Sequence, residues 1–258
     1  MTQHLPILYQ FRLSMFPEKV RWALDYKNIP HIRHNMLPGP HIPQVLKLTN
    51  KQQTCTPLLQ TEEGLLTNSN QILAWLENRY PNPALFPTDP TLKAEVDAEI
   101  TRFDEWGPHT RRALFHAFLP HTRYAASAFA QGTRTLKRAA YTAVFPGVRI
   151  AMRKAMDIND EQAARSNEVV KQALDYLATN TARTGYLVGD QFTAADLTAA
   201  TCMHCVAHPA EFPARFPEPR AKGHEDWMAR WGDHPAIQWV RHIYSAHRPA
   251  SVAIKNID

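Results

Sequence analysis

A cluster of prolines about a third of the way along the chain constrains the fold more than any other stretch. The segment 81–90 reads PNPALFPTDP and holds four prolines. Because proline fixes φ and has no backbone N–H, this stretch cannot continue a helix or pair inside a sheet. It is therefore predicted to be an extended linker. It separates residues 1–80 from residues 91–258, and the two parts differ in the period of their apolar residues.

The part before the linker alternates short apolar runs with amphipathic stretches, which indicates mixed α/β structure. Strands are expected at 5–11, 29–35, 57–61 and 65–67, and helices at 18–27, 42–48 and 69–80. Glycine tolerates positive φ, so Glu62-Glu63-Gly64 favours a hairpin between the last two strands. The predicted order is β-α-β-α-β-β-α.

The part after the linker shows almost no strand signal. Helical spacing of apolar residues predicts helices at 91–118, 132–156, 160–179, 193–205 and 235–244. The sequence therefore predicts an α/β N-terminal domain followed by an all-α C-terminal domain.

Composition favours a soluble globular protein in a reducing compartment. The chain is 44% apolar and has no run of 18 apolar residues, so it can build a core but is not expected to enter a membrane. The first residues lack the pattern of a signal peptide. Its three cysteines, Cys55, Cys202 and Cys205, cannot all pair. A cytoplasmic location is expected.

Four short motifs occur in a particular order along the chain. They are Leu8-Tyr9 with Ser14 and KVRWAL at 19–24; TPLL at 56–59; NSNQI at 68–72; and YLVGD at 186–190 with FTAAD at 192–196. In this order and spacing they resemble the motifs of cytosolic glutathione transferases of the serine type, with no class assigned. The resemblance covers nearly the whole chain. It implies a thioredoxin-like, glutathione-binding domain at 1–80 and a helical domain for the second substrate at 91–258.

Thr56-Pro57 is the first candidate contact for glutathione. X–Pro bonds adopt cis at low cost, and the residue before proline is held extended. An extended Thr56 can pair with the backbone of a bound peptide, and in the family this position holds the cysteinyl part of glutathione. An ordinary proline at the start of a strand is the alternative interpretation.

The start of the third helix is the second candidate contact. Ser69 offers a hydroxyl at a helix N-terminus, which is a natural site for a carboxylate, and the resemblance implies the γ-glutamyl end of glutathione. A helix cap alone is the alternative. Asn68 stands where the family usually has Glu, so it can hydrogen-bond an α-amino group without supplying charge. The resemblance also implies that Gln53 lies where relatives contact the glycyl carboxylate.

Ser14 is the candidate catalytic residue, because a hydroxyl between the first strand and the first helix can donate a hydrogen bond to a thiolate. The helix terminus adds positive potential, and both effects lower the pKa of a bound thiol. A simple N-cap is the alternative role. Tyr9 is the competing catalytic residue, since tyrosine-type relatives place their hydroxyl near the end of the first strand.

Two other polar patterns are expected to be structural. Thr193-x-x-Asp196 has the spacing of a capping pair at a helix start. Cys202 and Cys205, with His208 nearby, are predicted to lie in the body of a helix as small apolar residues of the core, and no metal is expected.

The positive charge of the chain is confined to one segment. The net charge is +5, yet residues 106–156 hold no Asp or Glu and nine Lys or Arg, which leaves 20 basic against 24 acidic residues elsewhere. In the family these helices wall the second-substrate site, so a positive funnel for an anionic ligand competes with a solvated face. No nucleic-acid-binding motif accompanies the charge, so nucleic acid is not an expected partner.

Two functions follow from the resemblance. One is an enzyme that activates glutathione thiolate for attack on a small electrophile, acidic electrophiles included, with conjugation, isomerisation or dehalogenation as variants. The other is a non-catalytic relative that binds proteins. A homodimer is implied in either case.

Overall fold

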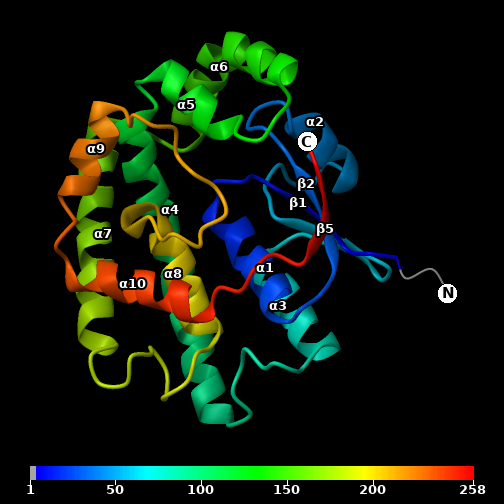
Figure 1. Cartoon of the computed structure of the whole chain (residues 1–258), viewed down its shortest axis with the longest axis vertical. Helices are drawn as coiled ribbons and strands as arrows, with labels where there is room; N and C mark the ends of the chain where they lie inside the picture. The colour runs from blue at the N-terminus through cyan, green and yellow to red at the C-terminus, as the bar shows by residue number, and fades with distance from the viewer. Residues whose placement is uncertain (1–3) are drawn as a thin grey trace.

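A five-stranded mixed sheet forms the centre of the first domain in the computed structural model, which describes residues 4–258 (Figure 1). Its strands are β1 (Ile7–Gln10), β2 (His31–Asn35), β3 (Leu58–Thr61), β4 (Gly64–Leu66) and β5 (Ala253–Ile257). The strand order is β4-β3-β1-β2-β5. β1 runs parallel to β2 and antiparallel to β3, and β3 pairs antiparallel with β4.

Three helices complete this domain: α1 (Met15–Tyr26), α2 (Ile42–Leu48) and α3 (Ser69–Arg79). Alternate residues of β1 face opposite sides of the sheet. Leu8 packs into the large core that also contains residues of α1 and α3, whereas Tyr9 packs against the small cluster of Met36, Val45 and Leu58. The first domain thus has helices on both faces of its sheet, as a thioredoxin-like fold requires.

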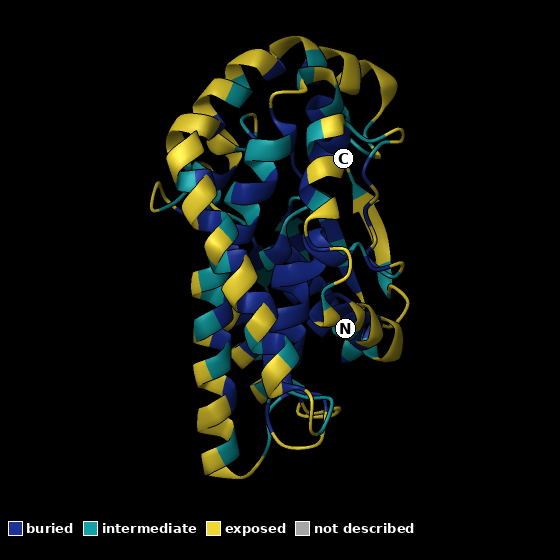
Figure 2. Ribbon diagram, turned by 90° about the vertical axis from the view of Figure 1, so that its left-hand side faces the viewer, coloured by how far each residue is buried: buried dark blue, intermediate teal, exposed yellow. Residues whose placement is uncertain are grey.

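The second domain consists of seven helices within the described residues. They are α4 (Pro90–Phe118), α5 (Thr122–Phe129), α6 (Thr135–Ala155), α7 (Asp160–Asn180), α8 (Ala194–Ala207), α9 (Lys222–Ala229) and α10 (Pro235–His247). Every residue of α8 is buried, because this helix is apolar on all sides and packs against α4, α10 and α1. α8 therefore joins the cores of the two domains, and Figure 2 shows the continuous buried interior beneath exposed outer helix faces.

The start of α8 confirms the predicted capping pair. The Thr193 hydroxyl accepts the N–H of Ala195 at 3.2 Å, and Asp196 accepts the N–H groups of Thr193 at 2.9 Å and Leu187 at 2.8 Å. Burial raises the pKa of Asp196 to about 6, although these hydrogen bonds act to lower it. None of the helices described is long and apolar enough to cross a membrane.

The order β-α-β-α-β-β-α and the following helical domain confirm the predicted fold class. Two short helices, α5 and α9, were not expected. One expectation is wrong: the segment 91–258 is not helical to its end, because β5 returns to the first domain and pairs parallel with β2. β5 is a short edge strand whose Ile254, Lys255 and Asn256 are exposed, so its pairing partner rather than its own pattern decides its structure.

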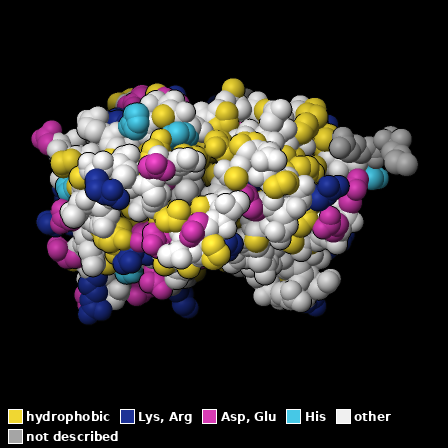
Figure 3. All heavy atoms as spheres, turned by 90° about the horizontal axis from the view of Figure 1, so that it is seen from below, with side chains coloured by type: hydrophobic (Ala, Val, Ile, Leu, Met, Phe, Trp, Pro, Cys, Tyr) yellow, Lys and Arg dark blue, Asp and Glu magenta, His cyan; other side chains and the backbone are white. Residues whose placement is uncertain are grey.

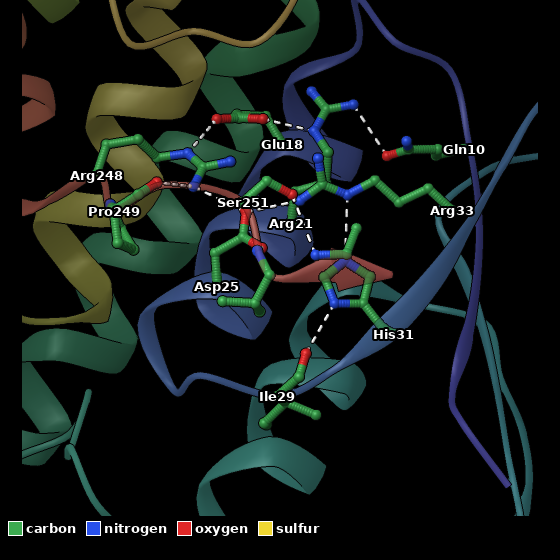
Figure 4. Close-up of polar contacts among 12 residues, drawn as sticks. Gln10, Glu18, Arg21, Asp25, Ile29, His31, Arg33, Arg248, Pro249 and Ser251 are labelled. Carbon is green, nitrogen blue, oxygen red and sulfur yellow. Dashed lines mark hydrogen bonds and ion pairs between the residues drawn. The ribbon is translucent and has the colours of Figure 1, made fainter. Parts of the chain in front are cut away.

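A buried ionic network anchors the C-terminal segment to α1 (Figure 4). Arg248 donates to Glu18 at 2.8 Å and to Asp25 at 2.9 Å. Arg21 pairs with Glu18, and Arg33 pairs with Asp25, each at 2.6 Å. Burial acts to raise the pKa of Glu18, but the charges of Arg248 and Arg21 outweigh it and hold the pKa below its ordinary value. Each of the two acids is thus shared by two arginines.

Candidate functional site

A cavity of about 410 Å³ lies between the two domains. The first domain contributes the loop after β1 with the first residues of α1, residues 38–42 at the start of α2, and the segment 54–56 before β3. Helices α4, α5, α6 and α8 supply the opposite side. Most of its lining side chains are apolar, and none is Asp or Glu. The cavity can therefore hold a small, mainly apolar molecule next to its few polar side chains, which include Ser14, Thr56 and Arg111.

Ser14 lies in this cavity at the N-terminal end of α1. Its backbone has the geometry of an N-cap, with φ −88° and ψ 137°, yet its side chain makes no capping hydrogen bond. Arg21 fixes the preceding loop by donating to the carbonyl of Arg12 at 3.0 Å and more weakly to that of Phe11 at 3.4 Å. Because the Ser14 hydroxyl makes no capping hydrogen bond, it is free to bind a ligand. The buried guanidinium of Arg21 fixes the loop that precedes it.

Tyr9 lies on β1, on the face of the sheet that α2 covers. Its ring centroid is 5.0 Å from that of His34, and it packs against the cluster beneath α2. It is not among the residues that line the cavity with Ser14.

Thr56 lines the same cavity as Ser14, and the bond to Pro57 is cis, as its position in the sequence led us to expect. No hydrogen bond among residues 4–258 uses the backbone N–H or C=O of Thr56, and its hydroxyl oxygen is buried without a partner. These groups remain available to pair with an extended ligand backbone.

The N-terminus of α3 lies at the same end of the sheet. Leu66, the last residue of β4, pairs with Leu59 near the start of β3, so the start of α3 and the segment before β3 lie at the same end of the β3–β4 hairpin. The N-cap of α3 is Asn68, whose side-chain oxygen accepts the N–H of Asn70 at 2.8 Å. Our expectation that Ser69 caps this helix is wrong by one residue: Ser69 is the first helical residue, and either side chain suits a cap. Ser69 is buried and lies outside the cavity lining.

Gln53 connects the two segments. Its side-chain amide donates to the carbonyl of Thr67 at 2.9 Å, which ties the loop before Thr56 to the residue before Asn68. Of the predicted glutathione contacts, only Thr56 lines the cavity with Ser14; Gln53, Pro57, Asn68 and Ser69 follow along the neighbouring strand ends.

Sequence comparison decides the family. Residues 8–84 match the glutathione S-transferase N-terminal domain, and residues 139–230 match the glutathione S-transferase C-terminal domain. The chain belongs to the glutathione S-transferase family.

Curated relatives of this chain include two isomerases. A maleylpyruvate isomerase from Ralstonia is 34% identical over 93 residues, which are 35% of this chain and 43% of that protein. A maleylacetoacetate isomerase from Pseudomonas aeruginosa is 37% identical over 94 residues, which are 34% of this chain and 43% of that protein. The matched part of the chain thus spans less than half the length of these relatives.

Solved structures share the fold of this chain over almost its whole length. A glutathione S-transferase from Pseudomonas fluorescens has a TM-score of 0.60 at 19% identity and covers 96% of this chain and 98% of its own. A Methylobacterium radiotolerans glutathione S-transferase in complex with glutathione sulfonate has a TM-score of 0.57 at 21% identity, with 95% of each chain covered.

The basic segment 106–156 does not form a funnel into the cavity. Of its nine Lys and Arg side chains only Arg111 lines the cavity. Arg112, Arg149 and Arg153 donate to backbone carbonyls, and the other five side chains are exposed. Elsewhere the surface is mixed: on the face shown in Figure 3, acidic and basic side chains are interspersed. The solvated-face interpretation therefore holds for most of this segment.

The cysteines of α8, Cys202 and Cys205, are buried in the core, as expected. Burial raises the pKa of both thiols, that of Cys205 to about 12, so neither is a nucleophile near neutral pH. No group of three or more His, Cys, Asp or Glu side chains among residues 4–258 is arranged to hold a metal ion.

Two polar residues of the site were not identified from the sequence. Cys55 is exposed at the cavity, immediately before Thr56, and Arg111 faces the cavity from α4. The absence of acidic residues around Arg111 in the sequence was a signal, but it could not show which of nine basic side chains turns inward.

Proposed function

We propose that this protein is a glutathione-dependent enzyme in which the Ser14 hydroxyl stabilises the thiolate of bound glutathione. The thiolate sulfur then forms a bond to the electrophilic carbon of a small co-substrate. The observation that carries the proposal is the free hydroxyl of Ser14, which lines the interdomain cavity and makes no capping hydrogen bond. A hydrogen bond from this hydroxyl and the positive end of α1 both favour thiolate over thiol.

Glutathione would bind along the strand ends next to this hydroxyl. Thr56 would pair with its cysteinyl backbone, and Ser69 at the start of α3 would receive the γ-glutamyl carboxylate. Asn68 would contact the α-amino group, and Gln53 would use its second amide hydrogen for the glycyl carboxylate. The free backbone groups of Thr56 and the burial of Ser69 at the helix start support this arrangement.

The rates of two variants test the catalytic role. Ser14→Ala should lower kcat/KM for thiol transfer on the order of 10- to 100-fold, because it removes a hydrogen bond to a charged sulfur. The apparent pKa of the bound thiol, read from the pH profile, should rise toward about 8.5. Tyr9→Phe, which changes a side chain outside the cavity lining, is the matched control and should leave both unchanged. Loss of activity in Tyr9→Phe with retention in Ser14→Ala would refute the assignment.

A stability measurement separates catalysis from helix capping. Since the Ser14 side chain caps nothing in the structure, Ser14→Ala should change the free energy of unfolding by no more than about 0.5 kcal/mol. An N-cap role would instead cost about 1 kcal/mol.

One observation favours the second candidate, a non-catalytic protein-binding relative. The side-chain oxygen of Asn68 already accepts the N–H of Asn70, and it carries no charge for a glutathione ammonium group. Titration calorimetry with glutathione decides between the two: Asn68→Glu should tighten binding if the enzyme proposal is right. No binding by either form favours the protein-binding alternative.

By family resemblance we also propose that the protein is a cytoplasmic homodimer. Light scattering, which measures the molar mass in solution, would test the dimer.

A further inference from the structure

Arg111 is a cation without a counter-charge inside the interdomain cavity. It lies on α4, is partly buried, and its Nε is buried with no hydrogen-bond partner. No ion pair or hydrogen bond described for residues 4–258 uses its guanidinium. Its neighbour Arg112 behaves differently and donates to the carbonyl of Met156 at 2.9 Å and to the hydroxyl of Ser166 at 3.3 Å. Arg112 is a structural residue, whereas Arg111 is left free at the cavity.

The surroundings of Arg111 favour the binding of an anion. A guanidinium stays protonated in proteins, and a buried charge is costly unless it is paired. Burial lowers the pKa of Arg111, the Cys55 thiol opposes this shift, and Arg112 adds to it. No Asp or Glu lines the cavity to supply a counter-charge. An anionic ligand in the cavity would supply the missing partner.

We propose that Arg111 binds a carboxylate of the electrophilic co-substrate, so that the preferred electrophile is an apolar molecule carrying one carboxylate. This inference rests on the function proposed above. A guanidinium presents a planar pair of donors that match the two oxygens of a carboxylate. Leu114, Phe115 and Met152, which line the same cavity, would contact the apolar part. Arg111 would then determine which electrophiles bind, while Ser14 would stabilise the thiolate of glutathione.

A binding experiment tests the anion site without any need for turnover. Titration calorimetry compares 3,5-dinitrobenzoate with the uncharged 3,5-dinitrobenzamide; we expect the carboxylate to bind about 10- to 100-fold more tightly, and Arg111→Met to abolish this preference. Arg123→Met is the matched control, because Arg123 belongs to the same basic segment but is exposed outside the cavity. Equal affinity of the unmutated protein for both compounds, or equal loss in both variants, overturns the proposal.

A kinetic experiment identifies the source of the carboxylate. With 4-chloro-3,5-dinitrobenzoate, the glutathione sulfur bonds to the ring carbon and chloride leaves with the electron pair of the broken C–Cl bond. After correction for the uncatalysed rates, Arg111→Met should lower kcat/KM for this acid about 10- to 100-fold but change that for its carboxamide by no more than about threefold. The KM for glutathione should stay unchanged.

Two other outcomes have distinct meanings. A raised KM for glutathione, with both electrophiles equally affected, means that Arg111 holds a carboxylate of glutathione itself, and the proposal is overturned. Arg111-dependent binding of 3,5-dinitrobenzoate without turnover of either chlorinated compound supports the anion site and refutes the proposed enzymatic function instead.

Discussion

Replacement of Arg248 by methionine should test the buried network that anchors the C-terminal segment. Arg248 donates to Glu18 at 2.8 Å and to Asp25 at 2.9 Å, and all three side chains are almost fully buried. Removing one partner of a buried pair costs about 3–5 kcal/mol. Because Glu18 keeps Arg21 and Asp25 keeps Arg33, we expect the lower end of this range, about 3 kcal/mol at pH 7.

Urea and thermal unfolding, followed by circular dichroism, measure this loss. About 3 kcal/mol corresponds to a decrease in Tm of roughly 6–12 °C for a chain of this size. Arg165→Met is the matched control: Arg165 pairs with Glu161 at 2.9 Å on the surface, where both side chains are exposed. Its loss should cost no more than about 0.5 kcal/mol.

The pH dependence provides an independent check. The pKa of Glu18 is held below its ordinary value, so its ionised form stabilises the folded state above the unfolded pKa. This contribution is lost as the pH falls through the folded pKa. The difference in free energy of unfolding between the unmutated protein and Arg248→Met should therefore be largest at pH 7 and should become smaller below about pH 4.3. Equal unfolding midpoints for Arg248→Met and Arg165→Met at pH 7, or a difference that widens in acid, would refute this reasoning.

Three further predictions concern the core and the sheet edge. Thr193→Ala removes the N-cap of α8 and should lower the free energy of unfolding by about 1–2 kcal/mol in a urea titration; an unchanged midpoint would contradict the capping role. A thiol reagent should label Cys55 alone in the folded protein and reach Cys202 and Cys205 only in denaturant, so labelling of all three before unfolding would contradict their burial. Deletion of 252–258 should lower the Tm and speed amide exchange in β2, which loses its β5 partner; unchanged exchange would show that this pairing is not formed in solution.

Most of the fold could be predicted from the sequence, because the spacing of apolar residues and the positions of proline, glycine and capping residues are local properties. The proline segment, the glycine hairpin and the capping pair each depend on a few adjacent residues, and each lies where it was predicted. The cap of α3 was misplaced by one position because Asn68 and Ser69 are both good capping residues.

The features that depend on distant contacts were not predictable. β5 is a strand because β2 is available beside it, and its own residues carry no clear alternation. The role of Arg111 likewise depends on how α4 packs, since the same segment contains eight other basic side chains that turn to solvent or to backbone carbonyls. Among the candidate catalytic residues, the sequence favours Ser14 and leaves Tyr9 as the alternative; in the structure Ser14 lines the cavity, whereas Tyr9 packs beneath α2.

The pairing of β5 with β2 has a consequence for synthesis of the chain. Asp25 and Arg248 are 223 positions apart, so a ribosome working at about 5–20 residues per second takes roughly 10–45 seconds between them. Throughout that interval the nascent first domain carries an open β2 edge and an incompletely neutralised Asp25. Open strand edges pair readily with other chains. The first domain is therefore expected to require chaperone protection until the residues of β5 leave the exit tunnel, although all of its other elements have already been made.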